Sequence, residues 1–282
     1  MGELADEYSG VASPMDQTLS QFIFPGSHDA GTYAIKLAPA CDACRGGLRT
    51  ITEVPGLALL IGDLAGPWSQ AQGQDIYGQL HAGSRVFDLR FFEATPGDVS
   101  YAQDFNNSIQ SVIPFIGDYL DLTPLEVGKY YIHHTFSGPS SDEIWAGISA
   151  YLAEPGHDDE IIILNLSQMR AATGDMNAVS LRNFMREMYD AIGPQYFVPY
   201  ASPWAGMTLA DIQNNVTRPE QQIIAVLDAD IPAWTAADDD IRNLNWARIQ
   251  SAYFGTSPAV VSSGGGYPTP DDWDCQSYSP CE

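Results

Sequence analysis

Short apolar segments alternate with helical segments along most of this chain, and this alternation constrains the fold more than any other feature. Residues 160–166 (EIIILNL) and 221–227 (QQIIAVL) are near-continuous apolar runs, as expected for strands buried on both faces of a parallel sheet. Polar residues that can carry chemistry come at or just after successive strands. In a parallel α/β barrel such residues meet at the carboxyl face, so the pattern predicts a (β/α)8 barrel of the TIM type. The predicted strands are 22–24, 84–92, 129–134, 160–166 and 221–227, and the predicted helices are 69–82, 140–154 and 175–191.

A single domain accounts for the length of the chain. The chain has 282 residues, and a barrel domain typically needs about 250. With 45% hydrophobic residues it can bury a large core, and proline and glycine are spread along it rather than gathered in a linker. We predict one domain over residues 1–282, with a surface excursion at about 38–68 and a loop-rich segment at about 262–282.

A His-Asp pair directly follows the first predicted strand. The apolar segment stops at Pro25-Gly26, and His28 and Asp29 come next. A histidine just past the end of a buried strand lies at the rim of a barrel, where catalytic groups are usually placed. The alternative is a loop histidine that is capped by its neighbouring aspartate.

Residues 84–92 (SRVFDLRFF) show the alternation of a strand. Val86, Asp88 and Arg90 share one face. The opposite face carries Phe87, Leu89 and Phe91. Charges that point into a barrel are costly unless paired, and Asp88 and Arg90 can pair directly and present a guanidinium toward a pocket. The alternative is an edge strand with an ion pair that faces solvent.

Three further groups of polar residues need an interpretation. His133 and His134 end the third predicted strand, and alternation allows only one of them to point inward. Asp228 and Asp230 follow the last buried strand. His81 is predicted to lie on the helix at 69–82 and to be structural, because nothing nearby in the sequence partners it.

The charge balance restricts the possible partners. The chain has 12 Lys and Arg against 36 Asp and Glu, a net charge of −24. We therefore expect no nucleic acid as a partner, because nucleic-acid binding depends on cationic side chains that contact phosphates. The negative charge also argues against strong adsorption to anionic membranes.

Four cysteines fall in two close pairs, Cys41/Cys44 and Cys275/Cys281. A four-cysteine zinc site is possible, but the second spacing is wide for one, and two disulfides fit better. Disulfides imply an oxidising compartment, so we expect a secreted protein. The first residues are acidic and show no signal peptide, which would fit a mature form. The apolar run at 54–64 is far shorter than the roughly 20 residues of a membrane span.

The constellation resembles the phosphatidylinositol-specific phospholipase C family, in particular its bacterial, metal-independent branch. The motifs that carry the resemblance are residues 25–32 (PGSHDAGT), 83–90 (GSRVFDLR) and 132–134 (IHH). Each is modest alone, but their order and spacing are fairly specific. The resemblance covers roughly residues 20 to 230 and implies a distorted barrel that acts on phosphatidylinositol or a related phospholipid at a membrane surface.

The resemblance also implies a role for each site residue. His28 would be the general base that takes the proton of the inositol 2-hydroxyl, and His134 the acid that protonates the leaving oxygen of diacylglycerol. Arg90 would stabilise the charge on the phosphoryl oxygens, where the calcium-dependent branch has an acidic residue and a cation. Asp29 would hold His134 in its acid form, and Asp88 would orient Arg90. We therefore expect no metal, no cofactor and a monomer.

The sequence departs from the family in two places. The bacterial enzymes carry basic residues after the fourth and fifth strands, where this chain has Ser167-Gln168 and residues 228–230 (DAD). The late aspartate that partners the base histidine has no evident counterpart, although Asp228 or Asp230 could substitute. Two other functions stay open: a metal-dependent phosphodiesterase of the glycerophosphodiester or sphingomyelinase D type, and a catalytically idle binding module on the same fold.

Overall fold

A computed structural model describes residues 16–17, 24–39, 69–112, 121–134, 136–157, 160–171, 174–198, 208, 210–211 and 222–227 of the chain. Several sequence predictions lie outside these residues. They concern the four cysteines, most of the excursion at 38–68, Asp228 and Asp230, and the segment at 262–282. The single-domain prediction therefore stays a prediction.

Four parallel strands form the centre of the sheet: β1 (Gly26–Ser27), β3 (Val86–Glu93), β6 (Ile162–Ala171) and β8 (Ile223–Leu227). β1 and β6 flank β3, and β8 lies on the other side of β6. Their register places Phe87 beside Leu164 and Leu89 beside Leu166. The parallel strands predicted at 84–92, 160–166 and 221–227 are therefore confirmed.

The strand at 129–134 runs the other way, so the prediction of an all-parallel sheet is wrong here. β4 (Tyr130–His134) pairs antiparallel with β3 and with β5 (Phe136–Ser140). The reason is local. The amide of Ala94 donates to the Lys129 carbonyl and the amide of Gly128 donates to the Ala94 carbonyl, so the long connection after β3 begins and ends at one point. Gly128 has a φ of 78°, which suits glycine, and the chain then returns along β3. Two more strands, β2 (Lys36–Pro39) and β7 (Gly174–Asp175), pair antiparallel with β5 and β6.

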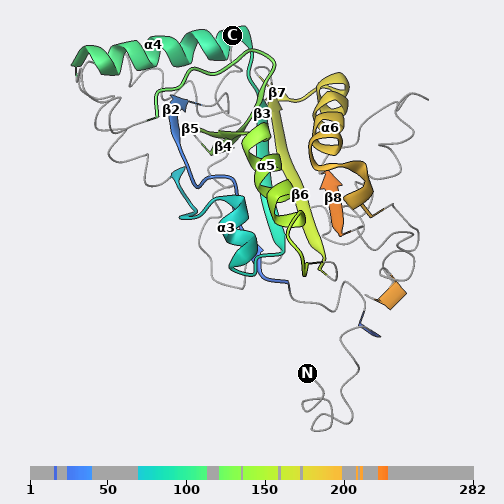
Figure 1. Ribbon diagram of the computed structural model, residues 1–282. Coiled ribbons are helices and arrows are strands. Elements are labelled where there is room, and N and C mark those ends of the chain that lie inside the picture. Colours follow the sequence, from blue (N-terminus) through green and yellow to red (C-terminus); the bar gives the residue numbers. More distant parts are fainter. Residues whose placement is uncertain are drawn as a thin grey trace, which may run out of the picture.

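Three helices pack against one face of the parallel strands (Figure 1). They are α3 (Ile76–His81), α5 (Ser141–Leu152) and α6 (Ala178–Ile192), and the short 3-10 helix η4 (Pro194–Tyr196) follows α6. α5 begins with a capping box between Ser140 and Glu143, at the start of the helix predicted at 140–154. α3 is shorter than predicted because Asp75 is its N-cap residue, and the side chain of Asp75 accepts a hydrogen bond from the Gly78 amide.

The core lies between these helices and the sheet. It contains Phe87, Leu89 and Phe91 from β3, which confirms the predicted apolar face of that strand. The helix α6 also contributes core residues, namely Leu181, Phe184, Met185, Met188 and Tyr189. A smaller cluster lies where α4 (Pro96–Val112) meets the sheet and includes Phe92, Ala102 and Tyr131.

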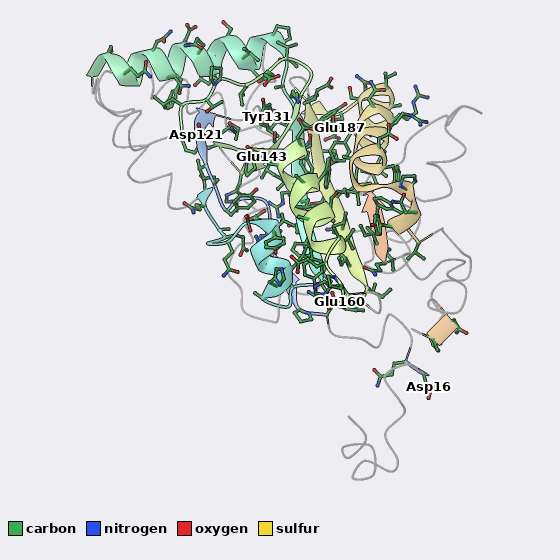
Figure 2. All side chains as sticks on the ribbon, in the orientation of Figure 1. Asp16, Asp121, Tyr131, Glu143, Glu160 and Glu187 are labelled. Carbon is green, nitrogen blue, oxygen red and sulfur yellow. The ribbon has the colours of Figure 1, made fainter. Side chains whose placement is uncertain are left out.

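A cluster of ionic and aromatic side chains lies at the end of the sheet where β3 and β6 begin. Arg85 Nη2 lies 2.7 Å from Glu160 Oε1, and Figure 2 shows Glu160 at the opposite end of the sheet from Tyr131. His81 belongs to this cluster, with Nε2 3.4 Å from Glu154 Oε2. The partner lies 73 residues further along the chain (154 − 81), so the sequence near His81 could not reveal it. Its structural role fits the position, since this face of an α/β sheet usually serves stability.

The α/β class is thus confirmed, while the sheet is mixed. The path β2-β5-β4-β3-β6-β7, with β1 on β3 and β8 on β6, is open within the described residues. Closure into a full barrel therefore stays a prediction. Among the same residues, no helix is both long and apolar enough to cross a membrane.

Candidate active site

The turn that carries His28 and Asp29 is fixed by backbone contacts. Asp29 has a φ of 49°, a left-handed conformation that aspartate tolerates better than most residues. Its carbonyl accepts hydrogen bonds from both the amide and the hydroxyl of Thr32. The next amide, that of Ala30, donates to the Asp88 carbonyl on β3 at 2.9 Å. The turn is therefore tied to the strand that supplies the other site residues.

The turn also needs a glycine at position 31. A Cβ atom there would lie 2.4 Å from the side chain of Ile132 on β4, closer than real Cβ contacts. The close approach brings the turn against β4, the strand that ends in His134. The GSHDAGT motif thus combines a polar pair with the backbone shape that presents it.

Asp88 and Arg90 lie on the face of β3 that points away from the core. Their side chains are 17% and 10% exposed, and Arg90 Nη2 donates to Asp88 Oδ2 at 3.1 Å. The predicted pair on one strand face is therefore present. Its environment is largely buried, so the alternative of a solvent-facing ion pair does not hold for this structure.

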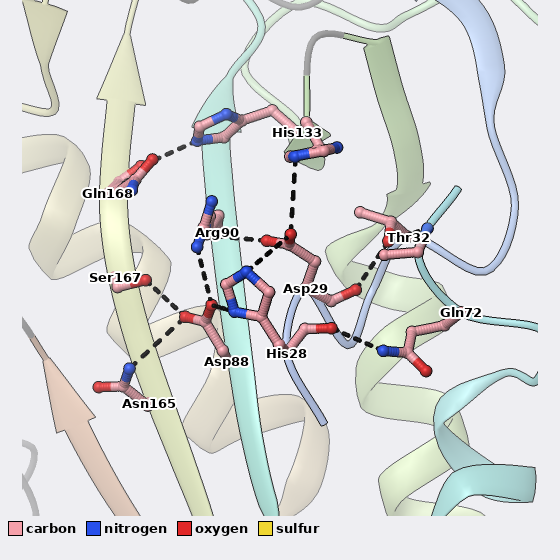
Figure 3. Close-up of polar contacts among 12 residues, drawn as sticks. His28, Asp29, Thr32, Gln72, Asp88, Arg90, His133, Asn165, Ser167 and Gln168 are labelled. Carbon is pink, nitrogen blue, oxygen red and sulfur yellow. Dashed lines mark hydrogen bonds and ion pairs between the residues drawn. The ribbon is translucent and has the colours of Figure 1, made fainter. Parts of the chain in front are cut away.

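His28 lies between two carboxylates, as Figure 3 shows. Its Nδ1 is 3.0 Å from Asp88 Oδ2, and its Nε2 is 3.2 Å from Asp29 Oδ2. The hydrogen bond to Asp88 is the main reason why the pKa of His28 lies above its ordinary value; burial opposes this shift and the charge of Asp29 adds to it. Asp88 is thus the carboxylate that orients His28, a partner that the sequence did not reveal.

Asp88 also receives contacts from β6. Ser167 Oγ donates to Asp88 Oδ1 at 2.7 Å, and Asn165 Nδ2 lies 3.5 Å from the same oxygen. Burial alone would raise the pKa of Asp88, but the hydrogen bond from His28, the charge of Arg90 and the bond from Ser167 together hold it well below its usual range. The carboxylate therefore stays ionised throughout the neutral range.

Asp29 connects the remaining groups. Its side chain is only 4% exposed, and its Oδ1 forms an ion pair with Arg90 Nε at 3.1 Å. Its Oδ2 is 3.6 Å from His134 Nε2 as well as 3.2 Å from His28. Both histidines and the guanidinium thus surround one buried carboxylate.

His133 and His134 differ as strand alternation requires. His133 is buried, and its Nε2 lies 2.9 Å from the Gln168 carbonyl. Burial lowers the pKa of His133 to about 4, so this ring is neutral at physiological pH. The contact of His133 with Gln168 connects β4 to β6, and His134 is the residue of the pair that contacts Asp29 in the site.

The structure brings together all five residues that the sequence singles out, namely His28, Asp29, Asp88, Arg90 and His134. Sequence reasoning noted Ser167 only because the bacterial enzymes have a basic residue after this strand, and it did not foresee the bond from Ser167 to Asp88. A signal was available, because Asn165 and Ser167 are polar at alternate positions directly after the apolar residues 161–164. Gln72 was also missed, and its side chain donates to the His28 carbonyl at 2.6 Å.

Sequence comparison identifies two relatives whose names refer to phospholipase C. A PI-PLC X domain-containing protein of Dictyostelium discoideum is 31% identical over 97 residues, which are 32% of this chain and 15% of that protein. The variant-surface-glycoprotein phospholipase C of Trypanosoma cruzi is 24% identical over 156 residues, 55% of this chain and 33% of that protein. The resemblance to phosphatidylinositol-specific phospholipase C is confirmed.

The similarity is limited in extent. The chain spans a third or less of the length of these two curated relatives. No protein-family model matches it. Two structures of the phosphatidylinositol-specific phospholipase C of Staphylococcus aureus align with 76% and 78% of this chain and 49% and 51% of their own, at 15% and 16% identity and a TM-score of 0.39.

Proposed function

We propose that this protein cleaves phosphatidylinositol, or a related phospholipid, to diacylglycerol and inositol 1,2-cyclic phosphate. The observation that carries the proposal is the gathering of two histidines and one arginine around the buried carboxylate of Asp29. Two imidazoles can supply a base and an acid near neutral pH, and a guanidinium that contacts the same carboxylate suits the negative charge of a phosphodiester. The substrate would be met at a membrane surface, and secretion and a monomeric state remain part of the same proposal.

In the first step, His28 acts as the base. Its Nδ1 donates to Asp88, which leaves Nε2 to take the proton of the inositol 2-hydroxyl in place of its contact with Asp29. The 2-oxygen forms a bond to phosphorus while the bond from phosphorus to the glycerol oxygen breaks. His134 gives its proton to that leaving oxygen, so diacylglycerol departs neutral. Water can later open the cyclic phosphate with the two roles reversed.

Arg90 and Asp29 support this step electrostatically. The Arg90 guanidinium is held in place by Asp29 and Asp88, so its remaining N–H groups can face the phosphoryl oxygens without reorganisation. Asp29 Oδ2 lies 3.6 Å from His134 Nε2, so the carboxylate can orient this ring for its role as the acid.

The proposal predicts how activity depends on pH. Only neutral His28 can act as the base, and Asp88 raises its pKa, so kcat/KM should fall on the acid side with a midpoint above the ordinary 6.5. Asp88→Asn should move that midpoint to lower pH, because a neutral amide no longer favours the imidazolium. Asp175→Asn, at an exposed aspartate paired with Arg170, is the control and should leave the midpoint in place. A midpoint that does not move in Asp88→Asn would contradict the assignment of His28 as the base.

A metal-dependent phosphodiesterase is the second candidate, because one ligand atom each from His28, Asp29 and Asp88 lies within 4.8 Å of the other two. The Arg90 guanidinium contacts both of these carboxylates, so it already supplies the positive charge that a cation would bring. We therefore expect that EDTA leaves the release of cyclic phosphate unchanged and that Ca²⁺ or Mg²⁺ does not stimulate it. Activity lost in EDTA and restored by a divalent ion would favour the second candidate.

The product profile tests the proposal itself. Phosphorus NMR of reactions with a panel of phospholipids should show the cyclic phosphate from phosphatidylinositol. Cleavage of phosphatidylcholine alone would keep the two-histidine chemistry and discard the headgroup. No product from any phospholipid would favour the idle binding module.

A further inference from the structure

Two polar side chains of β6 face the site across the parallel pairing with β3. The register places Asn165 beside Asp88 and Ser167 beside Arg90. Neighbours in register point to the same side of a sheet, so both side chains share the face of the catalytic residues. The other face of β6, with Leu164 and Leu166, packs into the core.

The two oxygens of Asp88 have different partners. Oδ1 accepts the hydroxyl of Ser167 at 2.7 Å, with the Asn165 amide at the limit of a hydrogen bond, 3.5 Å away. Oδ2 faces His28 Nδ1 at 3.0 Å and Arg90 Nη2 at 3.1 Å (Figure 3). A carboxylate rotates about its terminal bond with little resistance, so a donor on one oxygen determines where the other oxygen lies.

We propose that Ser167 is a positioning residue that fixes the rotation of the Asp88 carboxylate, so that Asp88 Oδ2 contacts both the base His28 and the guanidinium of Arg90. Ser167 is buried, with 7% exposure, and lies on a strand that is hydrogen-bonded to the strand of Asp88. Donor and acceptor are therefore both held by the sheet. The role rests on the proposed function, since it concerns the same reaction, but Ser167 acts through Asp88 and not on the phosphate.

The competing explanation is that the hydroxyl only solvates a buried charge. The two explanations differ in their effect on His28. If Ser167 only solvates the charge, its removal leaves Asp88 in place with a less stabilised carboxylate, which holds the imidazolium more strongly and raises the pKa of His28. If Ser167 positions Asp88, its removal lets the carboxylate turn away, and the pKa of His28 falls.

The first test needs no substrate. The pKa of His28 is measured by NMR titration of its ring protons in the wild type and in Ser167→Ala, and the resonance is assigned by its absence in His28→Gln. We expect a lower pKa in Ser167→Ala and a wild-type pKa in Ser167→Thr, which keeps the hydroxyl. Ser180→Ala, at a buried serine on α6, is the matched control and should change nothing. A raised or unchanged pKa in Ser167→Ala would overturn the proposal.

The second test uses the reaction. Ser167→Ala should lower kcat about tenfold, the effect expected for a hydrogen bond to a charged group, with KM nearly unchanged. In an Asp88→Asn background the same change should cost no more than about twofold, because residues that act through one another are not additive. A tenfold loss in that background would contradict action through Asp88.

An unfolded alanine variant and an inactive wild type are two different failures of these tests. Ser167→Cys, which keeps the volume but donates weakly, replaces Ser167→Ala if the alanine variant does not fold, and the expected direction of the pKa change is the same. If the wild type cleaves no phospholipid, the proposed function fails, and the titration of His28 still decides whether Ser167 positions Asp88.

Discussion

Replacing either His28 or His134 by alanine is expected to lower kcat by about 10²–10⁴-fold, the usual contribution of one positioned acid or base. His28→Ala removes the group that takes the hydroxyl proton, and His134→Ala removes the group that protonates the leaving oxygen. Both rings contact Asp29 Oδ2, at 3.2 and 3.6 Å, so each variant also alters the surroundings of the other ring. The double variant should therefore lose less than the product of the two single losses.

The leaving group distinguishes the two histidines. A substrate whose leaving group needs no proton, such as a nitrophenyl ester of inositol phosphate, should restore much of the activity of His134→Ala and little of that of His28→Ala. Release of the nitrophenolate measures both rates. His81→Gln is the matched control, because His81 belongs to the cluster at the other end of the sheet, and its activity should stay within about twofold of the wild type. Equal rescue of both variants would contradict the assignment of base and acid.

The part of the site that lies on one strand could be predicted from the sequence. Alternation in residues 84–92 separates Asp88 and Arg90 from the aromatic face, and the structure has this division. The parallel strands at the centre of the sheet could also be predicted, because near-continuous apolar runs of this length are typical of strands that are buried on both faces of a sheet. Local patterns suffice wherever the periodicity of one element decides which side chains point together.

The contacts between strands could not be predicted in this way. The partner of His28 is Asp88, 60 residues away (88 − 28), and it is fixed by the hydrogen bond from Ala30 to the Asp88 carbonyl. The bond from Ser167 depends on the register between β3 and β6, which no single strand specifies. The antiparallel direction of β4 arises where backbone groups near Ala94 and Lys129 meet, and hydrogen bonds of this kind carry almost no sequence signal.

Replacing Arg90 by glutamine is expected to reduce both activity and stability. The variant leaves the carboxylates of Asp29 and Asp88 without their shared cation, and Asp29 is only 4% exposed. Loss of one partner of a buried ion pair costs about 3–5 kcal/mol in the free energy of unfolding, which urea titration at pH 7 can measure. The loss of a preorganised donor to the phosphoryl oxygens should lower kcat by about 10²–10³-fold in the same variant.

The stability loss should depend on pH in a defined direction. The pKa of Asp88 is held below its unfolded value, partly by Arg90, so this contribution to stability is present above the unfolded pKa and is lost as the pH falls through the folded one. The difference in unfolding free energy between the wild type and Arg90→Gln should therefore shrink in acid. A difference that is constant from neutral to acidic pH would show that packing, and not charge, accounts for the loss.

Two further variants separate charge from geometry and activity from stability. Arg90→Lys keeps the charge, but an ammonium group lacks the planar fork that contacts Asp29 and Asp88 at once, so kcat should stay far below the wild type while much of the stability returns. Arg85→Gln breaks the ion pair with Glu160 at the other end of the sheet and should lower stability without lowering kcat. If Arg90→Lys were as active as the wild type, a single positive charge would be sufficient at this position. The site would then not require the fixed fork, and a bound cation could replace the guanidinium in the reaction.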